Sequence, residues 1–349
     1  MKDIDKRFLI ALLRFHGDMV LVTPLIKAIK RLNPNAKIDL LVYKGTGQVL
    51  SDDYRIDKVF EANLSSQNNF LKRISGEIRL YFQLRSQNYD FGIFMTTQWR
   101  MTFFSRVISS AKRTGVGDSK RRGKFWINSF DKIFPEVGNK HIVERNLSSL
   151  ESLGFKLIPE DYQLDLKISK DSEEAIKKTL EQSNIGPEYC VFHPFSRREA
   201  KLWNVDRFAA LADYYSNKGL KVVLTSGPEQ EEVDYLDKIE KECSESVLNL
   251  GGRTSLTELA ALIKEARFFV GLDSVSSHIA AAVNIPCVTL FGPSISNNWR
   301  PWSDKAFIIE RKEEKKCQVH SPLGGKFERC LCYIQVERVI ESIDEAMLL

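Results

Sequence analysis

Three turns that follow apolar, strand-length segments carry the side chains best suited to chemistry. The first is His16-Gly17-Asp18, which comes directly after the run Arg7–Arg14. A carboxylate in such a turn can serve as a general base when a substrate hydroxyl lies within hydrogen-bond reach. Asp18 has an alternative role as the cap of the helix that begins at Met19, and taken alone the turn is more typical of a cap. The residues by themselves leave both roles open.

The second turn is the cationic segment 193–203, with the sequence HPFSRREAKLW. Arg197, Arg198 and Lys201 stand beside Ser196 and precede a predicted helix. Guanidinium and ammonium groups that converge beside a hydroxyl are suited to binding a pyrophosphate. Charged side chains solvated on a loop are the alternative interpretation.

The third turn lies within residues 266–293, whose sequence ARFFVGLDSVSSHIAAAVNIPCVTLFGP predicts a strand, a tight turn, a helix and a strand. Asp273 and Ser274 stand at the predicted N-cap of a helix that runs to Val283. The free N–H groups and the dipole of such a helix favour phosphate. An ordinary βαβ unit with a well-capped helix is the alternative. His278 lies one turn into the helix, where a lone histidine is more often structural than catalytic.

Basic residues are concentrated in the first half of the chain. Residues 1–165 hold 27 Lys and Arg against 18 Asp and Glu, a net charge of +9, whereas the remainder carries −4. The excess gathers just before the aromatic residues Phe125, Trp126 and Phe130, at Lys112, Arg113, Lys120, Arg121, Arg122 and Lys124. Such a segment suits an anionic partner, namely a phosphorylated glycan, a membrane surface or a nucleic acid. A solvated charged face is the alternative.

The elements that must position these turns alternate between strand and helix along the whole chain, which predicts parallel, doubly wound sheets. A chain of 349 residues has room for two domains. We place the domain boundary near residue 168, which gives a first domain 1–168 and a second domain 169–333. An amphipathic helix over residues 334–349 closes the chain, and it either packs on the second domain or returns to the first. One helix is predicted over Met19–Leu32, with Pro24 in its opening turns.

Several familiar motifs are absent from the sequence. It holds no GxGxxG after the first strand, no GxxxxGK[ST] and no GxSxG. Cys317, His320, Cys330 and Cys332 offer zinc ligands, but their spacing matches no standard structural site. No apolar run approaches the roughly 20 residues of a membrane helix, and the first fifteen residues do not resemble a cleavable signal. We therefore expect a cytosolic protein whose six cysteines are thiols.

Taken together, these segments resemble the glycosyltransferase family 9 heptosyltransferases of lipopolysaccharide core synthesis. FHGDMVLVTPLIKAIKRLNPNAKIDLLVY is similar to the opening of that family, and HPFSRREAKLWNVDRFAALADYY to its second-domain phosphate loop with the Lys-x-Trp. LTSGPEQEE and VGLDSVSSHIAAAVNIPCVTLFGP are similar to its later donor-site segments. The similarity runs from about residue 7 to 345. The His-Gly-Asp-Met turn and Trp299-Arg-Pro-Trp look most like the branch that adds the third heptose, the heptosyltransferase III branch.

This resemblance implies a GT-B fold, in which two Rossmann-like domains face a central cleft. The first domain would bind the acceptor and the second the nucleotide sugar. The implied reaction is an inverting, metal-independent transfer of heptose from ADP-heptose, a substrate and not a cofactor, onto a lipopolysaccharide inner core. Asp18 would be the general base and Lys201 would neutralise the departing diphosphate. The implied donor-binding residues are Ser196, Arg197, Lys201, Glu229, Asp273, Ser274, Val275 and His278.

The resemblance also implies partners for the first domain. Its ligand would be a phosphorylated glycolipid at the cytoplasmic face of the inner membrane, with peripheral contact to that membrane. We expect His16, Lys120, Arg121, Arg122 and Lys124 to bind this acceptor. A monomer without a nucleic-acid partner is expected.

Three other functions stay open at this point. A nucleotide-sugar epimerase can share the same architecture, but it would act without an acceptor. A transferase could move another sugar to a surface glycan. A sugar-nucleotide or glycan-binding protein without activity would need Lys201 but could lose Asp18.

Overall fold

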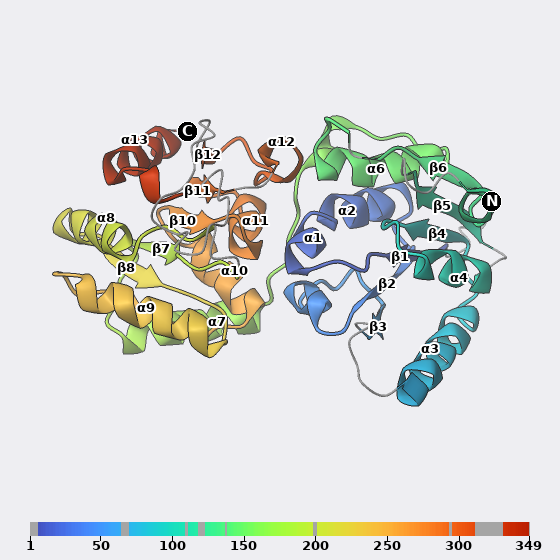
Figure 1. Cartoon of the computed structure of the whole chain (residues 1–349), viewed down its shortest axis with the longest axis horizontal. Helices are drawn as coiled ribbons and strands as arrows, with labels where there is room; N and C mark the ends of the chain where they lie inside the picture. Colours follow the sequence, from blue (N-terminus) through green and yellow to red (C-terminus); the bar gives the residue numbers. More distant parts are fainter. Residues whose placement is uncertain are drawn as a thin grey trace, which may run out of the picture. The chain divides into compact units, whose positions relative to one another are not determined.

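The computed structural model describes residues 6–63, 70–108, 111–117, 123–136, 138–197, 201–292, 295–310 and 331–348. The chain divides into two compact units, Met1–Lys167 and Ile168–Leu349, each of which is a layered α/β structure (Figure 1). Among the described residues, no helix is both long enough and apolar enough to cross a bilayer.

The first unit is built on a parallel six-stranded sheet with the order β3-β2-β1-β4-β5-β6. Its strands are β1 (Arg7–Ala11), β2 (Lys37–Tyr43), β3 (Lys58–Ala62), β4 (Phe91–Phe94), β5 (Lys112–Val116) and β6 (Lys132–Phe134). The central strand β1 lies between β2 and β4, with Leu9 opposite both Asp39 and Gly92. Strands buried on both faces read as continuous apolar runs, and RFLIA is such a run.

Helices cover both faces of this sheet (Figure 1). The helical elements of the unit are α1 (His16–Val20), α2 (Thr23–Leu32), α3 (Phe70–Arg85), α4 (Arg100–Val107), α5 (Lys124–Ile127) and α6 (Ile142–Ser152), with short 3-10 turns η1 (Thr46–Leu50) and η2 (Pro159–Tyr162). On the side of α3 and α4, a core forms from Leu9 and Ala11 of β1, Phe94 of β4, and Phe104 and Trp126 of the helices. Alternate residues of β1 therefore serve two separate layers of side chains.

The helix predicted over Met19–Leu32 is wrong in one respect, because the structure has two helices there. The turn that holds Asp18 is itself the short helix α1, and α2 begins at Thr23 with Pro24 in its first turn. Proline has no N–H and clashes with the preceding turn, so it starts a helix but does not continue one.

The second unit repeats the strand order of the first, as β12-β11-β10-β7-β8-β9. Its strands are β7 (Tyr189–His193), β8 (Lys221–Leu224), β9 (Leu248–Asn249), β10 (Phe269–Leu272), β11 (Cys287–Phe291) and β12 (Ala306–Glu310). Its helices are α7 (Lys170–Gln182), α8 (Val205–Asn217), α9 (Gln230–Glu242), α10 (Leu256–Lys264), α11 (Val275–Ala282), α12 (Ser296–Trp299) and α13 (Val336–Met347), with the 3-10 turn η4 (Leu331–Tyr333). Short β5, β6, β9 and β12 were not expected from the sequence.

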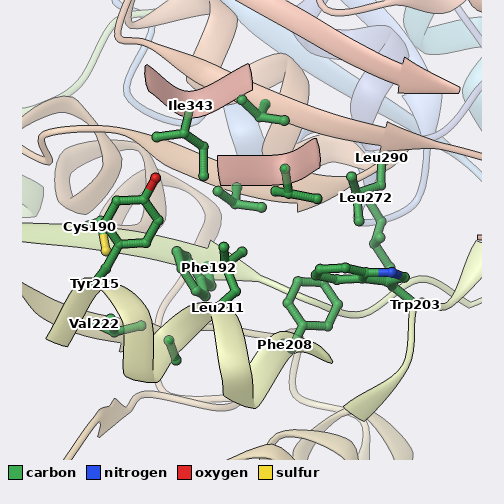
Figure 2. Packing of buried hydrophobic residues seen from close by; sticks show 14 of the residues in the cluster. Cys190, Phe192, Trp203, Phe208, Leu211, Tyr215, Val222, Leu272, Leu290 and Ile343 are labelled. Atoms are coloured by element: carbon green, nitrogen blue, oxygen red, sulfur yellow. The ribbon is translucent and has the colours of Figure 1, made fainter. Parts of the chain in front are cut away.

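The main core of the second unit lies between the sheet and helices α8 and α13 (Figure 2). The rings of Trp203 and Phe208 meet edge to face with centroids 4.8 Å apart, and the indole Nε1 of Trp203 donates to Ile334 O over 2.9 Å. Val339 and Ile343 of α13 are fully buried in the same core. The closing helix is therefore part of the second unit, where it packs on β11, β12 and α8.

Candidate active site

The candidate residues lie where the strand order of each sheet reverses. That reversal falls between β1 and β4 in the first unit and between β7 and β10 in the second. Doubly wound sheets bind ligands outside the carboxyl ends of the strands at such a point. The segment after β1 carries Asp18, the segment after β7 carries Ser196 and Lys201, and the segment after β10 carries Asp273. All three predicted turns thus lie at the reversal point of the sheet in their own unit.

Asp18 lies within the first turn of α1, after the N-cap residue Phe15. Asp18 therefore does not have the capping role that was the alternative to a general base. Burial raises the pKa of the Asp18 carboxyl, while the charges of Arg14 and Arg145 and the backbone N–H groups of Phe15 and Asp18 itself lower it. The Nε2 of His16 lies 3.2 Å from Gly45 O. A half-buried carboxyl with raised pKa beside two cations has the properties of a general base.

Arg145 is a charged residue of this site that the sequence reasoning missed. It lies on α6, only 6% exposed, and its Nη2 donates to Asn146 Oδ1 over 2.9 Å. Its Nε has no hydrogen-bond partner among the described residues. Burial and the charge of Arg14 lower the pKa of Arg145 to about 10, while the charge of Asp18 raises it. A buried cation is thus held within electrostatic range of the candidate base.

The adjacent residue anchors α6 to the segment that carries Asp18. Asn146 Nδ2 donates to Leu21 O, the residue that ends α1, over 3.1 Å. Arg145 and Asn146 follow Ile142 by three and four positions and so share its helix face. Two polar residues on the apolar face of an amphipathic helix were the sequence signal for this arrangement.

Lys201 and Asp273 form an ion pair across the reversal point of the second sheet. Lys201 is 9% exposed, and its Nζ donates to Asp273 Oδ2 although the two residues come from different loops. Removing one partner of a buried pair leaves the other charge uncompensated. In the ion pair, the ammonium of Lys201 and the carboxylate of Asp273 therefore compensate each other's charge.

The helix α11 begins beside this pair without the cap hydrogen bond expected of it. Ser274 is the N-cap, but its side chain accepts no backbone N–H; its Oγ lies 2.7 Å from Ser276 Oγ. One turn further, the Oγ of Ser277 donates to Leu272 O over 2.7 Å and so ties α11 to β10. The first N–H groups of the helix, including that of Val275, lack a side-chain cap and suit an anion.

His278 is buried in α11 beside the ion pair. Burial lowers the pKa of His278 to about 4; the charge of Asp273 opposes this shift, and the charge of Lys201 adds to it. Its Nδ1 has no hydrogen-bond partner in the described part of the chain. In the ligand-free protein the imidazole is therefore neutral at physiological pH.

The remaining donor candidates are less enclosed. Ser196 is half-buried and Arg197 is exposed. Glu229 is exposed at the N-cap of α9, which follows β8. Glu232, which the sequence reasoning did not single out, is half-buried, and its Oε2 accepts the N–H of Gly227 over 2.7 Å. Burial raises the pKa of Glu232, and the charge of Arg197 is among the influences that lower it.

The structure divides the basic segment predicted to bind the acceptor. Lys120, Arg121 and Arg122 lie outside the described residues, and Lys124 is exposed at the start of α5. Lys112 and Arg113 lie on β5, where an Arg113 guanidinium nitrogen is 2.9 Å from Asp131 Oδ1. The first part of the segment is therefore a strand and not a loop.

Of the zinc candidates, Cys317, His320 and Cys330 fall outside the described residues, and Cys332 is a buried thiol. Within the ranges that the structure describes, no group of three or more His, Cys, Asp or Glu could hold a metal ion.

Comparison with known proteins identifies relatives along the whole chain. The model of the family described as "Glycosyltransferase family 9 (heptosyltransferase)" matches residues 78–326. Lipopolysaccharide heptosyltransferase 3 of Escherichia coli K12 is 35% identical over 338 residues, covering 96% of each chain. A family 9 glycosyl transferase from Veillonella parvula superposes with a TM-score of 0.83 at 20% identity, covering 100% of this chain and 99% of that one. E. coli heptosyltransferase WaaC, solved with ADP-2-deoxy-2-fluoro heptose, superposes with a TM-score of 0.75 at 19% identity. This superposition covers 97% of this chain and 99% of the WaaC chain. The two solved structures support the GT-B fold of two Rossmann-like units.

Proposed function

This chain belongs to glycosyltransferase family 9, and on that premise we propose that it transfers a heptose from ADP-heptose to a lipopolysaccharide inner-core acceptor. The support for this substrate pair is the 35% identity to a lipopolysaccharide heptosyltransferase over 96% of both chains. The main support for the mechanism is the ion pair of Lys201 with Asp273 in the second unit. This pair lies beside the N-terminus of α11, which has no side-chain cap, at the point where the strand order of the sheet reverses.

Asp18 is the proposed general base. Its carboxylate takes the proton of the acceptor hydroxyl as that oxygen attacks the anomeric carbon and the bond to the diphosphate breaks. A base is most effective when its pKa approaches the working pH, and burial moves the pKa of Asp18 in that direction. Arg145 and Arg14 oppose that rise and so keep the carboxylate available in its ionised form.

The leaving group is the proposed ligand of Lys201. When the nucleotide sugar binds, the Lys201 ammonium exchanges part of its contact with Asp273 for the diphosphate, whose charge grows as the bond breaks. Backbone N–H groups at Ser274 and Val275 receive the same phosphates. Asp273 then has lone pairs for sugar hydroxyls. These roles need no metal ion.

The other donor residues have supporting roles in this proposal. Ser196 and Arg197, on the loop after β7, bind the diphosphate, and Glu229 accepts a hydrogen bond from a ribose hydroxyl. His278 is buried within electrostatic range of the Lys201–Asp273 pair. The acceptor is the ligand of His16, Lys120, Arg121, Arg122 and Lys124, at the cytoplasmic face of the inner membrane, with the enzyme acting as a monomer.

The test is incubation with a panel of nucleotide sugars and truncated lipopolysaccharide cores, read by mass spectrometry. We expect a mass increase of one heptose on the acceptor with ADP-heptose and not with other nucleotide sugars. Transfer of a different sugar would replace the donor assignment. Isomerisation of a nucleotide sugar in the absence of acceptor would instead support an epimerase.

A further inference from the structure

Three aromatic side chains of the first unit form an exposed cluster, which we term the aromatic patch: Trp99, Phe103 and Phe125. They are 45%, 49% and 43% exposed. The ring centroids of Trp99 and Phe125 lie 5.9 Å apart, and those of Phe103 and Phe125 lie 6.3 Å apart. Single exposed apolar residues need no explanation, but neighbouring exposed rings form a continuous apolar surface, and such patches are often interaction sites.

The same helices also bury aromatic residues, and the patch packs on one of them: the ring centroids of Trp99 and the buried Trp126 lie 6.0 Å apart. Phe104 of α4 and Trp126 of α5 are 0% and 1% exposed and lie in the core. Trp99, Phe103 and Arg106 follow each other at intervals of four and three residues and so share the outer face of α4. The helices therefore have one aromatic face for the core and a second that faces outward.

Cationic groups stand within and beside the patch. The guanidinium carbon of Arg106 lies 4.0 Å from the centroid of the Phe125 ring, a cation–π contact, and the Arg106 side chain is exposed. Lys124 is exposed beside Phe125 at the start of α5. Aromatic rings with Lys and Arg at their margin are the composition of surfaces that lie in the headgroup region of an anionic bilayer. The net charge of +9 in residues 1–165 has the sign that such a surface attracts.

The location of the patch connects it to the site of Asp18. Trp99 precedes α4 and follows β4, so it lies at the carboxyl edge of the sheet. Gln98 ties that segment to its neighbours: its Nε2 donates to Leu13 O over 3.1 Å, and its Oε1 accepts the hydroxyl of Tyr43 over 2.8 Å. Leu13 lies on the segment between β1 and α1, so patch and base belong to the same edge.

We propose that the aromatic patch docks the first unit on an anionic lipid surface, with its three rings at headgroup depth and Arg106 on lipid phosphates. The inference rests on the proposed function to the extent that a glycolipid acceptor gives the enzyme a reason to stay at a membrane. It adds the residues that make the contact, and none of them takes part in the chemistry assigned to Asp18 or Lys201.

The experiment measures binding to vesicles by flotation, with vesicles of phosphatidylethanolamine and phosphatidylglycerol against vesicles of phosphatidylcholine alone. We compare the wild type with the double variant Phe103→Ser/Phe125→Ser. The matched control is Tyr54→Ser, which removes an aromatic ring that is 81% exposed in the same unit but precedes β3 and so belongs to the opposite sheet edge. Arg106→Gln is a second variant that keeps all three rings and tests the charge alone.

We expect the double variant to bind the anionic vesicles at least roughly tenfold more weakly, since two large rings lose their apolar contact. Arg106→Gln should weaken binding less, and the Tyr54 variant should bind as the wild type does. Added salt should weaken wild-type binding because exposed charges are screened over about 8–10 Å. Both patch variants should keep the wild-type kcat and KM on a delipidated, water-soluble core oligosaccharide.

Two results would overturn the proposal. One is wild-type vesicle binding by both patch variants. The other is unchanged vesicle binding with a raised KM for the soluble oligosaccharide, which would make the patch a sugar-stacking surface of the acceptor site. Absence of heptose transfer by the wild type, with patch-dependent vesicle binding intact, would refute the proposed function and leave the lipid contact standing.

Discussion

Replacing Asp18 by Asn separates the catalytic role of this residue from any structural role. Asn keeps the size of the side chain and one acceptor oxygen for the backbone N–H groups of Phe15 and residue 18. It cannot take a proton from an acceptor hydroxyl. Loss of a general base typically lowers the rate by about 10² to 10⁴, which corresponds to about 3 to 5 kcal/mol in activation free energy. We expect kcat to fall within that range while the affinity for the donor stays unchanged.

Whereas kcat should fall, the folding stability of Asp18→Asn should not fall at mildly alkaline pH. Burial raises the pKa of Asp18 in the folded protein above its value in the unfolded chain. A carboxyl with a raised pKa stabilises the fold below the unfolded pKa, about 3.9 for Asp, and this contribution is lost as the pH rises through the folded pKa. At mildly alkaline pH the wild type therefore holds a half-buried charge that the Asn variant does not. The variant should be at least as stable there as the wild type, and this advantage should vanish in acid.

The measurements are kcat and donor affinity, together with thermal unfolding at acidic and mildly alkaline pH. Asp39→Asn is the matched control, because Asp39 is a fully buried carboxyl of the same sheet whose pKa burial also raises. It lies within β2 and accepts a hydrogen bond from the hydroxyl of Tyr89 over 2.8 Å, so its replacement should change stability and leave kcat near the wild-type value. More than about a tenth of wild-type activity in Asp18→Asn would remove Asp18 from the mechanism. Destabilisation of that variant at alkaline pH would contradict the electrostatic reasoning.

Three further outcomes are expected. Arg145→Gln removes a charge that lowers the pKa of Asp18, so the acidic limb of the pH profile of kcat/KM should move to higher pH. Arg145→Lys keeps the charge and should give a profile closer to that of the wild type. An equal loss of kcat/KM at every pH would indicate that Arg145 has a purely structural role. Lys201→Ala should weaken ADP binding in calorimetry and lower kcat, while a chelator should leave the wild type unaffected; activity lost in EDTA and restored by magnesium would contradict the metal-free mechanism. Gly271→Ala would bring a Cβ to 2.5 Å from the Phe269 ring and 3.3 Å from a backbone oxygen, so thermal denaturation should show a loss of about 1–3 kcal/mol, and wild-type stability would refute the close packing at this position.

Strand positions could be predicted from the sequence where the apolar run is continuous and ends at a clear stop. The strand, turn, helix and strand predicted within residues 266–293 are observed as β10, α11 and β11, because their apolar segments are interrupted by the polar Asp273 and Ser274 and followed by Gly292. The 3-residue strand β6 was missed because KIF has no pattern of its own and is recruited by pairing with β5. The helix division at Pro24 was missed because helical spacing of apolar residues continues through both helices.

The site shows the same difference between local and long-range information. The placement of Asp18, Lys201 and Asp273 at the carboxyl edge of a sheet could be predicted because each follows a strand of a parallel sheet. Their roles in the reaction stay predictions. The pairing of Lys201 with Asp273 joins residues 72 positions apart and has no local signal. Arg145 was overlooked for the same reason, since the anchor that places α6 at the Asp18 segment joins Asn146 to Leu21 across 125 positions. Its pKa, like that of Asp18, depends on burial and on partners that only the folded chain supplies.

The repeated strand order has a consequence for how the protein unfolds. Each unit has its own six-stranded sheet and its own set of fully buried side chains, so each can open as a separate cooperative block. A calorimetric trace should then contain two transitions, and a single melting temperature would not describe the protein. A nucleotide bound at Lys201 should raise the transition of the second unit alone, and substitutions at Asp18 should move only that of the first. Amide hydrogen exchange would assign each transition to its block.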